Sequence, residues 1–493
     1  MFVIEYTYSS KDSKIRIEIP CMSDKNVPNP RKAFCVHAHF YQPPREDPRT
    51  GVIPHEPGAQ PYDNWNEKIY DQCYRPNAEL GNFGRISFNI GPTLFGWLEK
   101  EHPDTYQLIR DQENAVFKQY GFSNAMAQSY NHSILPLASH EDKVTQVQWG
   151  MADYVYRFGH APKGMWMPET AVDMDTLRVM ADAGIEYTIM APWQAGRRGE
   201  VDCSQPYRIE LGGGKSIVGF FYDSDLSMKV SFLPESTVNA DGFMYEELRP
   251  KYPAAPRKPH LHMIATDGEL YGHHQPFRDK FLEWLTTGAL EKEPLTLTFP
   301  SLYLRDNPVT KTISIKNNTS WSCHHGIKRW SGVCECAEHG EWKGPMRHAF
   351  NRIADYVDDA QREALAPYGV DFLEFRGEYI HVLTGEETAD EQITRLLGNI
   401  PDDARKKLLL LMRAQYERQR MFTSCGWFFG EFDRIEARNN LSYAAIAVSL
   451  LEEATGCKDY YRKIYRALNQ IRSAATGVRA GTLFANAAGR SDD

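Results

Sequence analysis

Short apolar runs alternate with amphipathic stretches of helical spacing from about residue 31 to about residue 300. The segment DTLRVMADAGIEYTIMAP shows one such unit. Its apolar positions predict a helix that begins at Asp175 and ends at Gly184, because glycine favours the left-handed conformation that closes helices. The strand IEYTIMA follows and is closed by Pro192. Further strands are predicted at AFCVHAHF, GMWMPE, SIVGFFYD and LHMIATDGE, which together indicate an α/β sheet or barrel.

The two ends of the chain have a different pattern. The first 20 residues alternate between apolar and polar positions, as the two strands of a hairpin do. After about residue 340 the chain contains long helical segments such as DDARKKLLLLMRAQYERQRMF and ARNNLSYAAIAVSLLEEATG. We therefore expect a β-hairpin extension at residues 1–30, an α/β region at 31–305 and a mostly helical region at 306–493.

The composition of the chain indicates which kinds of partner and which cellular location to expect. The chain has 493 residues and a formal charge of -9, and no block of lysine and arginine marks a face for phosphates, so nucleic acid is not an expected partner. No run is long and apolar enough to predict a membrane span, and the N-terminus lacks the pattern of a signal peptide. Nine cysteines, an odd number, favour reduced thiols and a cytoplasmic location.

Two carboxylates are expected at the ends of predicted strands. In GMWMPETA, Pro168 ends regular pairing and leaves Glu169 at the mouth of the strand. In MIATDGELYGHH, the apolar run delivers Asp267, and Gly268 permits a tight turn. Taken singly, each carboxylate could be a strand-end cap or an ion-pair partner. Taken together, they are the smallest set of catalytic groups that can cleave a glycoside. One attacks the anomeric carbon and the other protonates the leaving oxygen.

The segments HAHFYQP, NHSILPLA, GMWMPETA, TDGELYGHH and SCGWFF resemble, in order and character, the five motifs of glycoside hydrolase family 57. The C-terminal half is similar to an uncharacterised helical domain fused to one branch of that family. The resemblance implies an incomplete (β/α)7 barrel followed by a C-terminal helical domain that closes over the cleft. It also implies a retaining enzyme that acts on α-glucans or related α-glycosides. Glu169 matches the nucleophile and Asp267 the general acid/base, in a hydrolase, an α-glucanotransferase or a branching enzyme.

His37 and His39 match the histidines of the first motif, which contact the sugar. Because they are two residues apart on a strand, both can face the same side and donate hydrogen bonds to hydroxyl groups. The same spacing would suit a metal pair, so a metal-dependent carbohydrate deacetylase is the alternative from another class. A metal site needs a third ligand, and the resemblance is to a metal-free branch, so we predict no metal and no cofactor. A catalytically silent glucan-binding protein is a further alternative, against which the intact Glu169 and Asp267 argue.

Other polar and aromatic residues are candidates for binding the carbohydrate. His132 matches the second motif but could equally be a hydrogen-bonding loop residue, and Asp223 lies at a strand end where Asp225 competes for the same role. Aromatic rings stack on the apolar faces of sugars, although burial in the core is the alternative for each ring. The full set of predicted substrate-binding residues is His37, His39, His132, Trp166, Trp193, Asp223, Glu269, Tyr271, His273 and Trp427. In the fifth motif, Gly426 stands where relatives commonly have an aspartate.

The segment CHHGIKRWSGVCECAEHG is rich in metal-ligating residues. Cys323, Cys334, Cys336 and several histidines would suffice for a structural zinc site, although their spacing matches no standard zinc motif. The alternative is a set of buried thiols in a loop.

Overall fold

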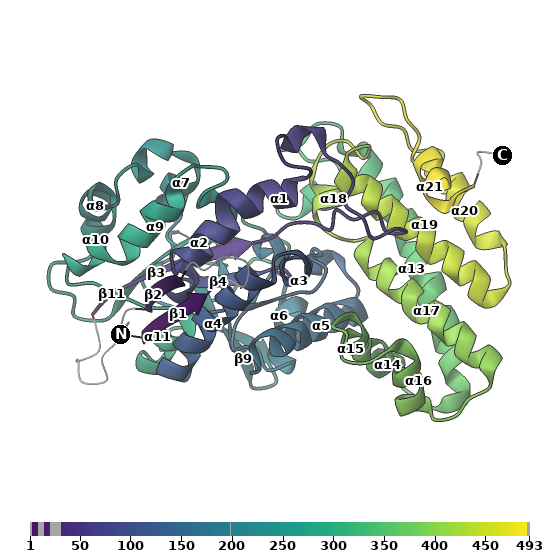
Figure 1. Cartoon of the computed structure of the whole chain (residues 1–493), viewed down its shortest axis with the longest axis horizontal. Helices are drawn as coiled ribbons and strands as arrows, with labels where there is room; N and C mark the ends of the chain where they lie inside the picture. Colours follow the sequence, from purple (N-terminus) through teal and green to yellow (C-terminus); the bar gives the residue numbers. More distant parts are fainter. Residues whose placement is uncertain (1, 8–13, 20–30, 198, 491–493) are drawn as a thin grey trace. The chain divides into compact units, whose positions relative to one another are not determined.

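The structure, a computed structural model, describes the backbone of residues 2–7 and 14–19, and residues 31–197 and 199–490 in full. The chain forms two compact units (Figure 1). The first contains residues 1–42, 55–128 and 157–317, and the second contains residues 43–54, 129–156 and 318–493. The second unit therefore takes in two short segments from the part of the chain that the sequence assigns to the α/β region.

The N-terminal strands β1 (Phe2–Thr7) and β2 (Lys14–Ile19) pair in antiparallel fashion, with Phe2 opposite Ile19. This pairing is the one expected of a hairpin. The predicted turn between the strands and residues 20–30 lie outside the described residues.

The long strand β3 (Lys32–Phe40) lies at the centre of a parallel sheet. It pairs along its length with β10 (His260–Asp267). Its other edge pairs with β11 (Thr296–Leu297) near its start and with β4 (Ser87–Ile90) near its end. Both β3 and β10 are buried along nearly their whole length, as expected for parallel strands that are covered on both faces.

Further parallel neighbours continue from β4. An isolated bridge joins Phe88 to Ala125, beside β5 (Ala127–Gln128), which pairs with β6 (Met165–Trp166). A second bridge joins Gly164 to β7 (Tyr187–Met190), which pairs with β9 (Lys215–Phe221). Strand β8 (Tyr207–Gly212) is antiparallel to β9. Beyond the end of β9, the Asp223 N–H donates to the Met263 carbonyl of β10 at 2.8 Å. The carboxyl ends of these parallel strands therefore share one edge.

Helices connect the strands of the first unit, as the alternating sequence pattern predicts. The predicted helix after Asp175 is α6 (Met174–Asp182), and the Asp173 side chain caps it by accepting from the Thr176 N–H at 2.7 Å. The others are α1 (Trp65–Ile69), α2 (Arg75–Glu79), α3 (Pro92–Glu101), α4 (Pro103–Tyr120), α7 (Ser224–Phe232), α8 (Ala240–Phe243), α9 (Arg278–Thr286), α10 (Gly288–Glu291) and α11 (Pro300–Asp306).

The second unit is mainly helical. Its long helices α13 (Lys343–Leu365), α17 (Asp402–Arg420) and α19 (Ile435–Thr455) pack against one another (Figure 1). Most of α5 (His140–Phe158) belongs to this unit, and its Trp149 is buried against Phe375 and Leu408. The remaining helices are α12 (Lys328–Ser331), α14 (Phe372–Glu378), α15 (Ile380–Leu383), α16 (Ala389–Leu397), α18 (Cys425–Phe428), α20 (Asp459–Leu468) and α21 (Ala480–Ala488).

Among the residues that the structure describes, no helix combines the length and the apolar character needed to cross a bilayer.

Candidate active site

The two predicted catalytic carboxylates both follow strands of the first unit. Asp267 is the last residue of β10 and lies opposite His39 of β3. Glu169 lies in the one-turn helix η5 (Pro168–Thr170), three residues after the end of β6. The charge of Glu169 raises the pKa of Asp267, so the two carboxyl groups interact electrostatically. The strand ends therefore bring together the pair of groups that the sequence predicts.

The backbone around Glu169 is strained. Glu169 has a φ of 58° and Thr170 a φ of 46°, in the left-handed region that side chains other than glycine rarely adopt. Such conformations cost roughly 1–3 kcal/mol each and occur where the surrounding structure enforces them. Here Gln194 does so, since its amide donates to the Thr170 carbonyl at 2.8 Å and its side-chain oxygen accepts from the Thr170 hydroxyl at 2.9 Å. Sequence analysis missed Gln194, which follows the predicted binding residue Trp193.

The surroundings of Asp267 favour its protonated form. It is the exposed residue of an otherwise buried strand end, so a ligand can reach it. The protein atoms around it nonetheless limit its hydration, and this effect, followed by the charges of Glu269 and Glu169, raises its pKa to about 8. Asp267 is therefore mostly protonated at neutral pH, as a group that must donate a proton requires.

Glu269 is a third carboxylate beside this pair. It is buried, and its Oε1 accepts hydrogen bonds from the Tyr41 N–H at 3.1 Å and the Tyr74 hydroxyl at 2.7 Å. Burial raises its pKa to about 7, although hydrogen bonds from Tyr74, Tyr41 and Gln42 oppose the rise. Glu269 is thus held by protein groups, and its charge acts on Asp267.

His37 and His39 are held by a hydrogen-bond network at the end of β3. His37 contacts the Ser87 hydroxyl through Nδ1 at 3.0 Å and Asn89 Oδ1 through Nε2 at 3.2 Å. His39 Nδ1 lies 2.9 Å from Asn89 Nδ2, and the same amide nitrogen donates to Gln128 Oε1 at 2.7 Å. Asn89 therefore organises both rings, and sequence analysis missed it because a single asparagine on a buried strand carries no recognisable motif.

Burial keeps both imidazoles neutral. It lowers the pKa of each ring to about 3, and the neighbouring His39 lowers that of His37 further. Trp166 stacks on both rings, with centroid distances of 4.8 Å to His37 and 5.1 Å to His39. Because Trp166 is fully buried, its position favours support of the histidines over the predicted contact with a sugar.

The histidine pair does not have the ligand set of a metal centre. Among residues 31–197 and 199–490, no third histidine, cysteine, aspartate or glutamate joins His37 and His39 in a group that could hold a metal ion. Three ligands from the protein are the usual minimum for a catalytic zinc. The arrangement therefore favours hydrogen bonding over metal binding.

The other predicted carbohydrate-binding residues of the first unit differ in how exposed their side chains are to solvent. Trp193 is partly exposed, and its ring meets Tyr222 edge to face with 6.2 Å between the centroids. His273 is partly buried, and its Nδ1 lies 2.7 Å from Gln72 Oε1. Tyr271 is a core residue, because its ring is buried and its hydroxyl accepts a hydrogen bond from Thr266. Trp193 and His273 remain the more accessible predicted contacts.

Asp223 has a structural role that the sequence did not reveal. Its carboxylate caps α7 by accepting from the Leu226 N–H at 3.1 Å, and it also contacts His262 at 3.0 Å and Lys251 at 3.3 Å. Burial alone would raise its pKa, but the bond to His262, the cap and the Lys251 charge lower it to about 2. None of these partners belongs to the predicted binding set, so this placement disfavours a contact with substrate.

His132 and Trp427, the predicted residues of the second and fifth motifs, belong to the second unit. His132 Nδ1 lies 2.6 Å from the Ser424 hydroxyl, and the Ser424 N–H donates to the His132 carbonyl. The second and fifth motifs are therefore in contact with each other. Trp427 is buried and stacks on Trp342 with 5.6 Å between the centroids.

Close packing explains why the fifth motif has a glycine at position 426. A Cβ atom at position 426 would lie 2.2 Å from Asn440 Nδ2 and 2.9 Å from the Glu436 carbonyl oxygen. No larger residue fits without a shift of the helix, so Gly426 is required by packing in this chain.

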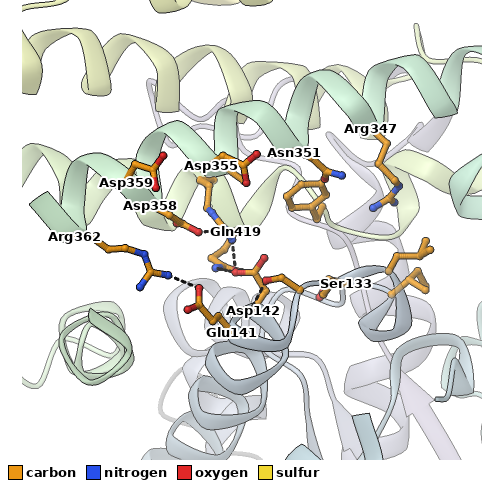
Figure 2. A pocket seen from close by; sticks show the side chains of 17 residues that line it. Ser133, Glu141, Asp142, Arg347, Asn351, Asp355, Asp358, Asp359, Arg362 and Gln419 are labelled. Atoms are coloured by element: carbon orange, nitrogen blue, oxygen red, sulfur yellow. Dashed lines mark hydrogen bonds and ion pairs between the residues drawn. The ribbon is translucent and has the colours of Figure 1, made fainter. Parts of the chain in front are cut away.

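The second unit also contains a polar pocket of about 400 Å³ (Figure 2). Its wall includes Asp142 and Asp358, which both bind the Arg418 guanidinium, and Figure 2 shows Arg362 directed at Glu141. None of the predicted site residues lines it. Three of its carboxylates, those of Glu141, Asp142 and Asp358, are paired with arginines, so an ion network holds this wall of the pocket together.

A family model matches most of the first unit and the two short segments of the second unit that lie before residue 317. The model of glycosyl hydrolase family 57 matches residues 33–316, which is more than half of the chain. A domain of unknown function, DUF3536, matches residues 339–486. The chain belongs to glycosyl hydrolase family 57, and the resemblance seen in its motifs is confirmed.

Curated relatives and solved structures agree with this family. Alpha-amylase 1 of Dictyoglomus thermophilum is 28% identical over 273 residues, covering 51% of this chain and 36% of the relative. The 4-alpha-glucanotransferase of Thermococcus litoralis is 28% identical over 184 residues, covering 36% of this chain and 27% of the relative. The chain thus matches about a third of the length of these proteins. An exo-type maltose-forming amylase from Pyrococcus sp. ST04 has a similar fold, with a TM-score of 0.72 at 17% identity over 92% of this chain and 88% of that one.

Proposed function

We propose that this protein is a retaining enzyme acting on α-glucans, either as a hydrolase or as an α-glucanotransferase or branching enzyme. The observation that carries the proposal is the pair at the strand ends, Glu169 and Asp267, in which the second group has a pKa of about 8. A double displacement needs a carboxylate nucleophile and a neighbouring acid that keeps its proton, and the raised pKa of Asp267 suits it to the second role. The amylase and glucanotransferase relatives support the substrate class.

The chemistry follows from the two roles. The Glu169 carboxylate attacks the anomeric carbon while the bond to the leaving oxygen breaks, and Asp267 donates its proton to that oxygen. A covalent β-glycosyl ester on Glu169 results. Asp267, now ionised, removes a proton from water or from a sugar hydroxyl, whose oxygen attacks the anomeric carbon and releases Glu169. Hydrolysis and transfer share every step except the identity of this acceptor.

The scaffold that we propose is an incomplete (β/α)7 barrel. The parallel succession of β3, β4, β5, β6, β7, β9 and β10, with a hydrogen bond from the end of β9 back to β10, supports this proposal. In such barrels the active site lies at the carboxyl ends of the strands. Both proposed catalytic residues follow strands at this edge.

The other site residues have proposed roles that match their placement. His39, Trp193, Glu269 and His273 are the proposed contacts to the carbohydrate, with His37 and Trp166 fixing the orientation of His39. For His132 and Trp427, which belong to the second unit, a role in binding carbohydrate stays a prediction that the resemblance implies. A cytoplasmic location stays a prediction based on cysteine usage.

Product analysis tests the proposed function directly. When maltoheptaose is incubated with the purified full chain, we expect the first product detected by proton NMR to be the α-anomer. Shorter chains without longer ones indicate hydrolysis, and longer or branched chains formed together with shorter ones indicate transfer. A β-anomer formed first would contradict the retaining mechanism. Release of acetate from N-acetylated sugars, with the glucan unchanged, would replace the proposal by a deacetylase.

The pH profile should report the protonation of Asp267. Because the acid acts in its protonated form and its pKa is raised to about 8, kcat/KM should fall as the pH rises through about 8. Glu269→Gln removes the negative charge that is the second cause of this raised pKa, so the basic limb should move to lower pH. Initial rates measured from pH 5 to 10 give the position of the limb.

Asp225→Asn is the matched control for the pH experiment. Asp225 is a carboxylate of the same unit, but it is paired with Lys251 and Lys229 and does not contribute to the raised pKa of Asp267. Its removal should leave the basic limb in place. An unchanged limb in Glu269→Gln would show that the charge of Glu269 does not act on the acid.

A further inference from the structure

Two short turns of the second unit present metal-ligating side chains to each other. The first turn runs from Cys323 to Gly326, with a hydrogen bond of 3.1 Å from the Gly326 N–H to the Cys323 carbonyl. The second runs from Cys334 to Ala337, with the equivalent bond at 2.9 Å. Each turn offers its first and third residues, so Cys323 and His325 face Cys334 and Cys336. The spacing differs from standard zinc motifs, which is why the sequence alone left the site undecided.

The four ligand atoms lie at the corners of a small tetrahedron, all within 4.8 Å of one another. Cys323 Sγ is 3.5 Å from Cys334 Sγ and 3.8 Å from Cys336 Sγ. His325 Nδ1 is 3.3 Å from Cys336 Sγ and 3.5 Å from Cys334 Sγ. Zinc–ligand bonds of about 2.3 Å to sulfur and 2.0–2.1 Å to nitrogen, in tetrahedral geometry, give separations of about 3.8 Å and 3.5 Å. The observed edges therefore enclose a space that fits a single ion.

The imidazole of His325 is oriented as metal-binding histidines are. Its Nδ1 faces the three sulfur atoms, while its Nε2 lies 3.4 Å from Glu335 Oε2. A carboxylate on the outer nitrogen of a ligating histidine fixes the tautomer and increases the basicity of the inner nitrogen. Simple burial of thiols would not explain this arrangement, because His325 and Cys336 are exposed and yet converge with the buried Cys323 and Cys334.

We propose that Cys323, His325, Cys334 and Cys336 bind one zinc ion in a closed structural site. Three thiolates and one imidazole form a standard donor set for structural zinc, and no position is left open for a substrate. This site is separate from the proposed glucan chemistry, and neither proposal depends on the other.

The zinc site would stabilise the part of the second unit that carries Trp427. The residues after Cys336 contact Gly430, directly after the fifth motif, since the Trp342 indole donates to the Gly430 carbonyl at 2.5 Å and a Cβ atom at Gly430 would lie 2.1 Å from the Glu338 carbonyl oxygen. Before Cys334, the Arg329 Nε donates to the Phe428 carbonyl at 3.2 Å. Fixing the two turns thus fixes the backbone around residues 428–430.

Metal analysis of the purified full chain tests this proposal. Mass spectrometry of the digested protein should find about one zinc per chain, as a closed four-ligand site requires. After the ion is exchanged for cobalt(II), the intense visible absorption of tetrahedral cobalt and a thiolate-to-cobalt band in the near ultraviolet should appear. Cys334→Ser and His325→Ala should lose both the zinc and the tetrahedral cobalt spectrum, and their thermal unfolding should shift to lower temperature.

Two substitutions serve as matched controls. His324→Ala removes the exposed histidine next to His325, and Cys457→Ser removes an exposed thiol outside the cluster. Both should keep the zinc. Protein that contains no zinc and takes up neither zinc nor cobalt after reduction would overturn the proposal. So would a disulfide between two of the cluster cysteines under reducing conditions, or retention of the full zinc content in both Cys334→Ser and His325→Ala.

Discussion

Glu169→Ala should reduce turnover of α-glucans to background, a loss of roughly 10⁴-fold or more, because no other group can form the covalent intermediate. Adding azide with an activated α-glycoside should restore part of the activity, since the small anion can enter the space left by the carboxylate. The product should then be the β-glycosyl azide, which NMR identifies. The fold should survive, because the Glu169 side chain is only partly buried.

Glu186→Ala is the control for this variant. Glu186 is an exposed carboxylate of the same unit, paired with Lys163. Its loss should leave turnover unchanged. Wild-type rates in Glu169→Ala would remove Glu169 from the mechanism, and a circular dichroism spectrum that differs from wild type would assign the loss to misfolding instead.

Asp267→Asn should show a different pattern of loss. Turnover of glucans, whose leaving oxygen needs a proton, should fall by about 10²–10⁴-fold. An aryl glycoside with an activated leaving group should still react in the first step, so that a burst of aryl alcohol precedes a slow steady state. Azide should accelerate the second step and give the α-glycosyl azide, the opposite anomer to that expected from Glu169→Ala. The basic limb of the pH profile should also disappear.

Equal losses on glucans and on the activated glycoside would contradict the role of Asp267 as the acid. A β-glycosyl azide from Asp267→Asn would exchange the roles of the two carboxylates. The pair of azide products therefore assigns nucleophile and acid independently of the sequence motifs.

The order of apolar and polar residues over a few positions was sufficient to predict several strands, one helix and one residue of the site. The strand β3 is rich in apolar residues, β10 contains the apolar run 263–265, and the helix α6 has both a capping aspartate and a glycine after its end. Asp267 could be predicted because an apolar run ends at it. These signals lie within a few residues of the feature that they predict.

The supporting residues of the site depend on contacts between distant segments. Asn89 acts through the rings of His37 and His39, about 50 positions away in the chain. Gln194 acts on Thr170 across 24 positions. Asp223 shows the converse difficulty, since an aspartate at a strand end has the same sequence pattern whether it caps the next helix or faces a ligand. Only the fold distinguishes these cases.

The second unit is built from three separate segments of the sequence, and this limits where the chain can be truncated. Cutting the gene after residue 317, between the two matched family models, would leave residues 129–156 attached to the first unit. Trp149 would then lose Phe375, Leu408 and the other apolar partners that bury it. The indole would then be an exposed apolar surface, which promotes aggregation. Swapping catalytic and helical modules between relatives would therefore have to carry the 129–156 segment along with the C-terminal part.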